Sequence, residues 1–182
     1  MDYSKIISFI EANITNLART YSEQLIKPEH MITYQKLEAS KIIAREEIVY
    51  GNLVNWLKSG ASNDEAEKLF EKIGAERFNQ GFPLTELNYA LFITKKVLWN
   101  AVGQKKELFG PLVFDELFKC MTVVNNYFDL GNFYMIRGYV NELFRKLDIS
   151  DKMSREEIHK ILIKGAFDED DLDKSEIVWR HV

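Results

Sequence analysis

Few residues in this sequence can end a helix. The 182 residues include nine glycines and three prolines. Between these breakers, apolar residues recur at three- and four-residue steps, which is the spacing of one face of an α-helix. The scarcity of turn residues favours a few long helices over many short strands. The sequence therefore predicts an all-α protein, a bundle of five to six helices.

The expected helices follow from the apolar period and its stop signals. Gly60 and Gly81 stand where helices end, because glycine adopts the positive φ of a helix C-terminus. Pro111 suits the first position of a helix. The predicted ranges are about 3 to 26, 29 to 58, 63 to 80, 83 to 102, 111 to 148 and 154 to 164. The fourth is apolar on most sides, so we expect it at the centre.

The fifth predicted helix, 111 to 148, is unusually long. At 1.5 Å per residue it would measure roughly 55 Å. We therefore expect it to bend near Gly131 or Gly138, or to project beyond the bundle.

The chain is expected to divide at about residue 150, and its composition changes in the acidic stretch after residue 165. Residues 1–150 are expected to form one helical domain. Residues 151–182 are expected to add a short helix, with Ser154 and Glu157 as its capping box, and an acidic tail with five acids between Asp168 and Asp173.

Net charge and cysteine content restrict which partners the chain can bind and which cellular compartment it fits. The formal net charge is -4, so the chain lacks the basic surface that nucleic acid or an anionic membrane requires. No apolar run is long enough to span a bilayer. Cys120 is the single cysteine, which rules out an intramolecular disulfide and fits a reducing, cytoplasmic setting. We predict no nucleic-acid partner and no membrane partner.

Catalytic and cofactor patterns are missing from the predicted bundle. A di-iron site needs two Glu-x-x-His pairs, and the chain offers one, Glu156 to His159. His30, His159 and His181 all lie outside the central helices, where a haem ligand would be needed. There is no nucleophile elbow and no phosphate-binding loop. We predict no catalytic residue, no metal and no cofactor.

Four polar residues fall on or near apolar helix faces. Glu46 follows Ile42 by four residues and should face inward, and Arg77 is close to the corner before the fourth helix. Two interpretations stay open for this pair: an ion pair that fixes packing, or contacts with a ligand. The same alternatives apply to Asn125 and Arg137 on the fifth predicted helix.

Aromatic residues surround the fifth predicted helix on more than one face. This pattern indicates a second buried face, and a homodimer is its simplest source. The residues expected at that dimer surface are Tyr127, Phe128, Phe133, Tyr134 and Tyr139.

Three segments together resemble a known family. They are "LEASKIIAREEIVYGNLVNWLKSG" (37 to 60), "IGAERFNQGFPLTELNYALFITKKVLWNAV" (73 to 102) and "YFDLGNFYMIRGYVNEL" (127 to 143). The chain resembles the N-terminal sensor domain of the RsbR type, the non-haem globin-like domain of stressosome regulators and some sensor histidine kinases. The resemblance implies a globin-related helical fold without haem, a dimer through the helices at the chain ends, and a role in relaying a signal.

The functional expectation follows from these points. We expect a non-catalytic, cytoplasmic sensor domain in signal transduction and the stress response, acting as a dimer on a separate output partner. No STAS, kinase or cyclase module follows the resembling region, so the chain either acts through a separate protein or is part of a longer one. One alternative is a protein that binds an apolar, fatty-acid-like small molecule in a cavity between the second, fourth and fifth helices. Another is a haem-binding globin sensor.

Overall fold

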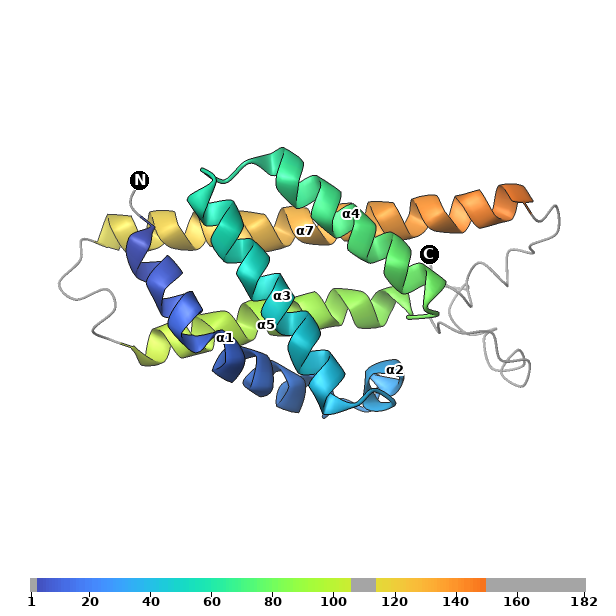
Figure 1. The fold of residues 1–182 in the computed structure, drawn as a ribbon, viewed down its shortest axis with the longest axis horizontal. Coiled ribbons are helices and arrows are strands. Elements are labelled where there is room, and N and C mark those ends of the chain that lie inside the picture. Colours follow the sequence, from blue (N-terminus) through green and yellow to red (C-terminus); the bar gives the residue numbers. More distant parts are fainter. Residues whose placement is uncertain (1–2, 106–113, 150–182) are drawn as a thin grey trace, which may run out of the picture.

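The computed structural model describes residues 3–105 and 114–149. The predicted helix at 154–164 and the acidic tail lie outside these residues. Within them the chain is all helical and contains no strand, which confirms the predicted fold class (Figure 1). The six helices are α1 (Ser4–Leu25), α2 (Ile32–Gln35), α3 (Ala39–Lys58), α4 (Asn63–Asn79), α5 (Leu84–Gln104) and α7 (Phe114–Ile149).

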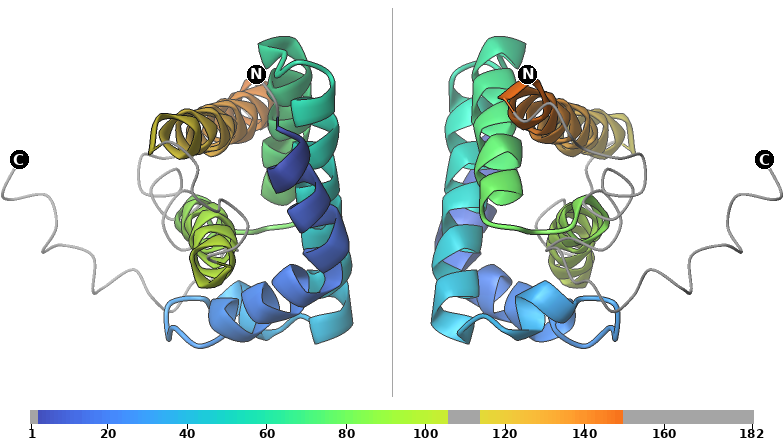
Figure 2. Two further views of the ribbon diagram at one scale, coloured as in Figure 1. Left: turned by 90° about the vertical axis from the view of Figure 1, so that its left-hand side faces the viewer. Right: turned by 90° about the vertical axis from the view of Figure 1, so that its right-hand side faces the viewer.

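The helices pack on two sides of a shared core. In Figure 1, α5 and α7 run along the length of the molecule and α3 crosses them. Seen from either end, α5 and α7 lie on one side, with α3 and α4 on the other (Figure 2). The most extensive helix–helix contact joins α4 to α7, followed by the contact between α1 and α3. As predicted, α5 buries residues on more than one side, including Leu87, Ile93 and Leu98.

The prediction of one helix over 29–58 was wrong at its beginning. The structure has a separate short helix, α2, and α3 begins only at Ala39. A carboxylate from α5 caps the start of α2. Glu86 is buried and accepts hydrogen bonds from the backbone N–H groups of Thr33, at 3.1 Å, and Tyr34, at 3.3 Å. These two N–H groups belong to the first turn of α2, where no intrahelical partner exists.

The long final helix is confirmed, but its glycines do not mark a bend. α7 is continuous from Phe114 to Ile149, and its C-terminal end reaches past α4 (Figure 1). A Cβ atom at Gly138 would lie 2.1 Å from the carbonyl oxygen of Glu71 on α4. In the same way, a Cβ atom at Gly74 on α4 would lie 2.0 Å from the carbonyl oxygen of Met135. These glycines let the two helix backbones touch.

The corner between α4 and α5 follows the sequence prediction. Gly81 has φ 76°, a conformation that glycine adopts without steric cost. The Phe82 N–H donates to the carbonyl of Arg77 at 3.1 Å, which closes the helix end. The Tyr139 hydroxyl of α7 donates to the Phe82 carbonyl at 2.8 Å. The corner is thus fixed both by its own turn and by α7.

In the part of the chain that the structure describes, no helix is both long enough and apolar enough to cross a membrane.

Candidate functional site

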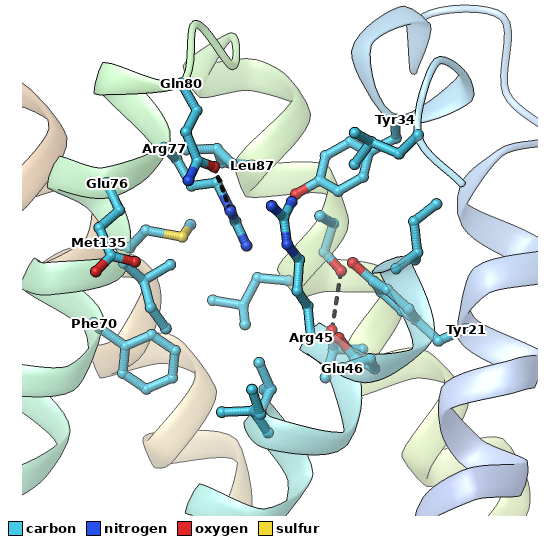
Figure 3. A pocket seen from close by; sticks show the side chains of 18 residues that line it. Tyr21, Tyr34, Arg45, Glu46, Phe70, Glu76, Arg77, Gln80, Leu87 and Met135 are labelled. Atoms are coloured by element: carbon cyan, nitrogen blue, oxygen red, sulfur yellow. Dashed lines mark hydrogen bonds between the residues drawn. The ribbon is translucent and has the colours of Figure 1, made fainter. Parts of the chain in front are cut away.

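A pocket of about 270 Å³ lies between the helices, and all six described helices contribute to its wall. We call it the central pocket (Figure 3). Its apolar wall includes Leu87 and Leu91 of α5, Phe70 and Ile73 of α4, and Met135 of α7. Its polar groups come from Tyr21, Tyr34, Arg45, Glu46, Glu76, Arg77, Gln80 and Thr94. An apolar cavity with a few convergent polar groups is the usual form of a small-molecule site.

Glu46 is a buried acid in this wall. Its side chain is 3% exposed and shares a hydrogen bond with Thr94, while its Oε1 has no hydrogen-bond partner. Burial raises the pKa of Glu46 from the ordinary 4.5 to about 8, because a charged carboxylate is poorly solvated there. Near neutral pH this carboxyl therefore carries its proton.

Arg45 and Arg77 enter the same pocket from α3 and α4 (Figure 3). Within the described residues, neither has a carboxylate within 4.0 Å. The Nη1 of Arg45 is buried and has no hydrogen-bond partner. Arg77 donates from Nη1 to Oε1 of Gln80 at 2.6 Å, and its guanidinium lies over the ring of Phe82.

The two guanidinium groups also affect each other. Burial lowers the pKa of Arg45, and the positive charge of Arg77 lowers it further. Like charges that face one cavity raise each other's energy, since the low-polarity wall screens them less than water does. The negative charge of Glu76 offsets part of this effect on Arg45.

The structure places two of the predicted polar residues together. Glu46 and Arg77 both line the central pocket, and the sequence period indicates an inward face for Glu46. Within the described residues they form no salt bridge with each other. Sequence reasoning missed Arg45, although it follows Ile42 by three residues and so lies near the same face.

The other two predicted polar residues lie elsewhere. Asn125 accepts a hydrogen bond from Nε1 of Trp99 at 2.9 Å, which joins α7 to α5. Arg137 forms salt bridges with Glu67 and, at 2.6 Å, with Glu71, which join α7 to α4. Both residues therefore make contacts between helices, outside the central pocket.

The predicted dimer surface needs correction at three of its five residues. Tyr127, Phe128 and Tyr139 are each at most 1% exposed and lie in the core of the chain itself. Phe133 is 57% exposed and Tyr134 is half-buried beside it. Helical spacing alone could not assign the aromatic residues to the inner or the outer face of α7.

The outer face of α7 nevertheless carries exposed aromatic residues. Phe118, Phe133 and Phe144 are each 57% to 60% exposed. At about 100° per residue they fall within about 80° of one another around the helix. We call this row the outer stripe of α7.

Comparisons with known proteins complete the description of the site. The family model described as the RsbT co-antagonist protein rsbRD N-terminal domain matches residues 47–148, more than half of the chain. Curated proteins and solved structures give no match, so the relation to the globin fold stays a prediction. Among the residues described, no group of three histidine, cysteine or acidic side chains is placed to hold a metal ion. The match begins just after Arg45 and Glu46, so these two pocket residues lie outside it.

Proposed function

The chain belongs to the family of RsbT co-antagonist rsbRD N-terminal domains, and on this premise we propose that it is a non-catalytic regulatory domain that acts in the cytoplasm as a homodimer, without haem. The family is one of stressosome-type signalling regulators. Its description names its members as co-antagonists of RsbT. We propose that its output partner is a separate signalling protein, as RsbT is for the family described.

The outer stripe of α7 carries the dimer part of the proposal. Large exposed aromatic residues along one helix face are costly in water, and a second copy of the same helix can cover them. α7 is also placed to respond to the interior, because Met135 lines the central pocket while Phe133 faces outward. A change of packing around Met135 would move the stripe.

Light scattering coupled to gel filtration tests the dimer. We expect a mass that rises toward that of a dimer with concentration, and Phe133→Glu should shift the equilibrium toward the monomer. Phe92→Glu is the matched control, since Phe92 is a comparably exposed phenylalanine on α5. A monomer at every concentration, or an equal effect of the two variants, would refute the proposed interface.

A second candidate function is a carrier of a small apolar molecule, and the central pocket favours it. A carrier holds its ligand through purification, whereas a sensor exchanges it. Native mass spectrometry of protein purified from cells separates these roles: a co-purifying organic molecule supports the carrier, and the mass of the protein alone counts against it.

A further inference from the structure

The charges that face the central pocket indicate what it can hold. Arg45 and Arg77 reach it as two cations with no carboxylate within reach among the described residues, and the Nη1 of Arg45 is buried without a partner. A buried donor without an acceptor costs free energy that a bound acceptor recovers. An anion placed between the two guanidinium groups would supply both the acceptor and a counter-charge in direct contact.

Glu46 does not oppose an anion near neutral pH. Its carboxyl is buried and protonated there, and its Oε1 is without a partner. Glu76 also lines the pocket, but its side chain is exposed to water, so its charge is screened. The central pocket therefore has a positive character, set by its two arginines.

The remaining wall of the pocket determines the polarity and size of the rest of the ligand. Most of the wall is apolar, with Leu87, Leu91 and Met135 among its members. A bare inorganic anion would leave this wall uncovered, whereas a molecule with an apolar body covers it. A cavity of 150 Å³ holds benzene, so 270 Å³ corresponds to about ten non-hydrogen atoms.

We propose that the central pocket binds a compact organic carboxylate, with its head group on Arg45 and Arg77 and its apolar body against Leu87, Leu91 and Met135. The two oxygens of a carboxylate match the parallel N–H groups of a guanidinium. A long-chain fatty acid exceeds the volume of the pocket.

Ligand affinity should also depend on pH through Glu46. Its ionisation above about pH 8 places a negative charge in the same pocket and weakens binding of an anion. The titratable groups around Glu46 do not change protonation between about pH 7 and pH 9. The tyrosines stay neutral because burial raises their pKa, and arginine stays protonated. These neighbours are Tyr21 on α1, Tyr34 on α2, Arg45 and Tyr50 on α3, Arg77 on α4 and Tyr127 on α7; Glu76 of α4 lies at the edge.

Calorimetric titration of the full chain tests the ligand class on the wild type. The probes are phenylacetate and octanoate, each with about ten non-hydrogen atoms, the neutral isostere phenylacetamide, the cation phenethylamine, and palmitate. We expect at least one compact carboxylate to bind, with phenylacetate at least tenfold tighter than its amide. Equal binding of the amide, preference for the amine, binding of palmitate alone, or no binding of either compact carboxylate would overturn the proposal.

Variants then locate the head group. Arg77→Gln and Arg45→Gln should each weaken binding of the compact carboxylate about tenfold or more, while Arg19→Gln, an exposed arginine on α1 outside the pocket, should leave it unchanged. Urea unfolding checks that each variant is folded. In the wild type the affinity should fall between about pH 7 and pH 9, and Glu46→Gln should remove most of that fall. Arginine variants that are folded and bind as the wild type does would refute the placement.

That this ligand is the input signal rests on the function proposed above. That the pocket binds it does not depend on that function. A chain that binds phenylacetate but never forms a dimer would refute the proposed dimer and leave the site standing. A dimer that binds none of the carboxylates would refute the proposed site and leave the dimer standing.

Discussion

Replacing Gly74 by alanine tests the closest contact in the bundle. The added methyl carbon would lie 2.0 Å from the carbonyl oxygen of Met135 and 2.8 Å from the backbone nitrogen of Tyr139. The first distance is about 1.4 Å short of ordinary van der Waals contact. Both atoms belong to the backbone of α7, so no side chain can rotate away. The two helices must separate.

The cost follows from what the separation uncovers. Phe70, Tyr127 and Tyr139 are buried along the interface between α4 and α7, and full burial of each is worth about 2 kcal/mol. A gap of about 1 Å forfeits a quarter to a half of the packing energy, or about 1.5–3 kcal/mol for the three. Residual overpacking adds about 1–3 kcal/mol, and the better helix propensity of alanine returns about 1 kcal/mol. We expect a net loss of about 1.5–5 kcal/mol.

Urea unfolding followed by circular dichroism measures this loss. Gly51→Ala is the matched control, because Gly51 also lies inside a helix but a Cβ atom there meets nothing within 4 Å. It should stabilise the protein by about 0.5–1 kcal/mol. The two substitutions are thus expected to have opposite signs. If Gly74→Ala also stabilises, α4 and α7 do not approach as closely as described.

Three further predictions concern buried and interhelical groups. The folded chain keeps the proton on Glu46 up to about pH 8 and the unfolded chain releases it near pH 4.5, so this group lowers stability as pH rises between these values, on the order of 4 kcal/mol in total. Urea unfolding of Glu46→Gln and wild type should therefore show a gap that grows in favour of the variant from about pH 5 to pH 8, and a constant gap would contradict the burial of the acid. Tyr139→Phe leaves the buried Phe82 carbonyl without its donor and should cost about 1–3 kcal/mol in the same assay; an unchanged free energy of unfolding would count against that bond. Arg137→Gln removes two partly exposed salt bridges to α4, so the midpoint of thermal unfolding should fall more at low than at high salt, and equal falls would argue against an ionic contribution.

Helix positions could be predicted where the signals were local. Gly60 and Gly81 have the positive φ that the sequence suggested, and α4 and α5 begin or end within about two residues of their predicted bounds. The break between α2 and α3 could not be predicted in this way. The start of α2 is capped by Glu86, which is more than fifty residues away along the chain.

Two glycines of α7 were expected to bend the helix, and the reason for that error is also physical. Gly131 and Gly138 interrupt an apolar helix, and sequence alone cannot distinguish a bend from a close approach. The neighbouring helix α4 shows that both are close approaches. Phe70 and the backbone of Glu71, both on α4, fill the space that side chains at these glycines would occupy. Gly74 offered no local signal that it faces α7.

The candidate site was predictable in part for the same reason. The helical period placed Glu46 on an inward face, but it could not tell that Arg77 would stay unpaired from it or that Arg45 would join them. Those facts depend on how α3 and α4 are placed around the central pocket. Likewise, the aromatic residues of α7 divide into Tyr127 inside and Phe133 outside only once its neighbours are in place.

The central claim is that the central pocket and the outer stripe of α7 are coupled through one helix. Sedimentation equilibrium can measure the dissociation constant of the dimer with and without saturating phenylacetate. Coupling between two sites usually changes an affinity at least about fivefold. The account predicts a change of at least that size in the wild type and none in Arg77→Gln under the same conditions. An unchanged constant in wild-type protein with the ligand bound would contradict it.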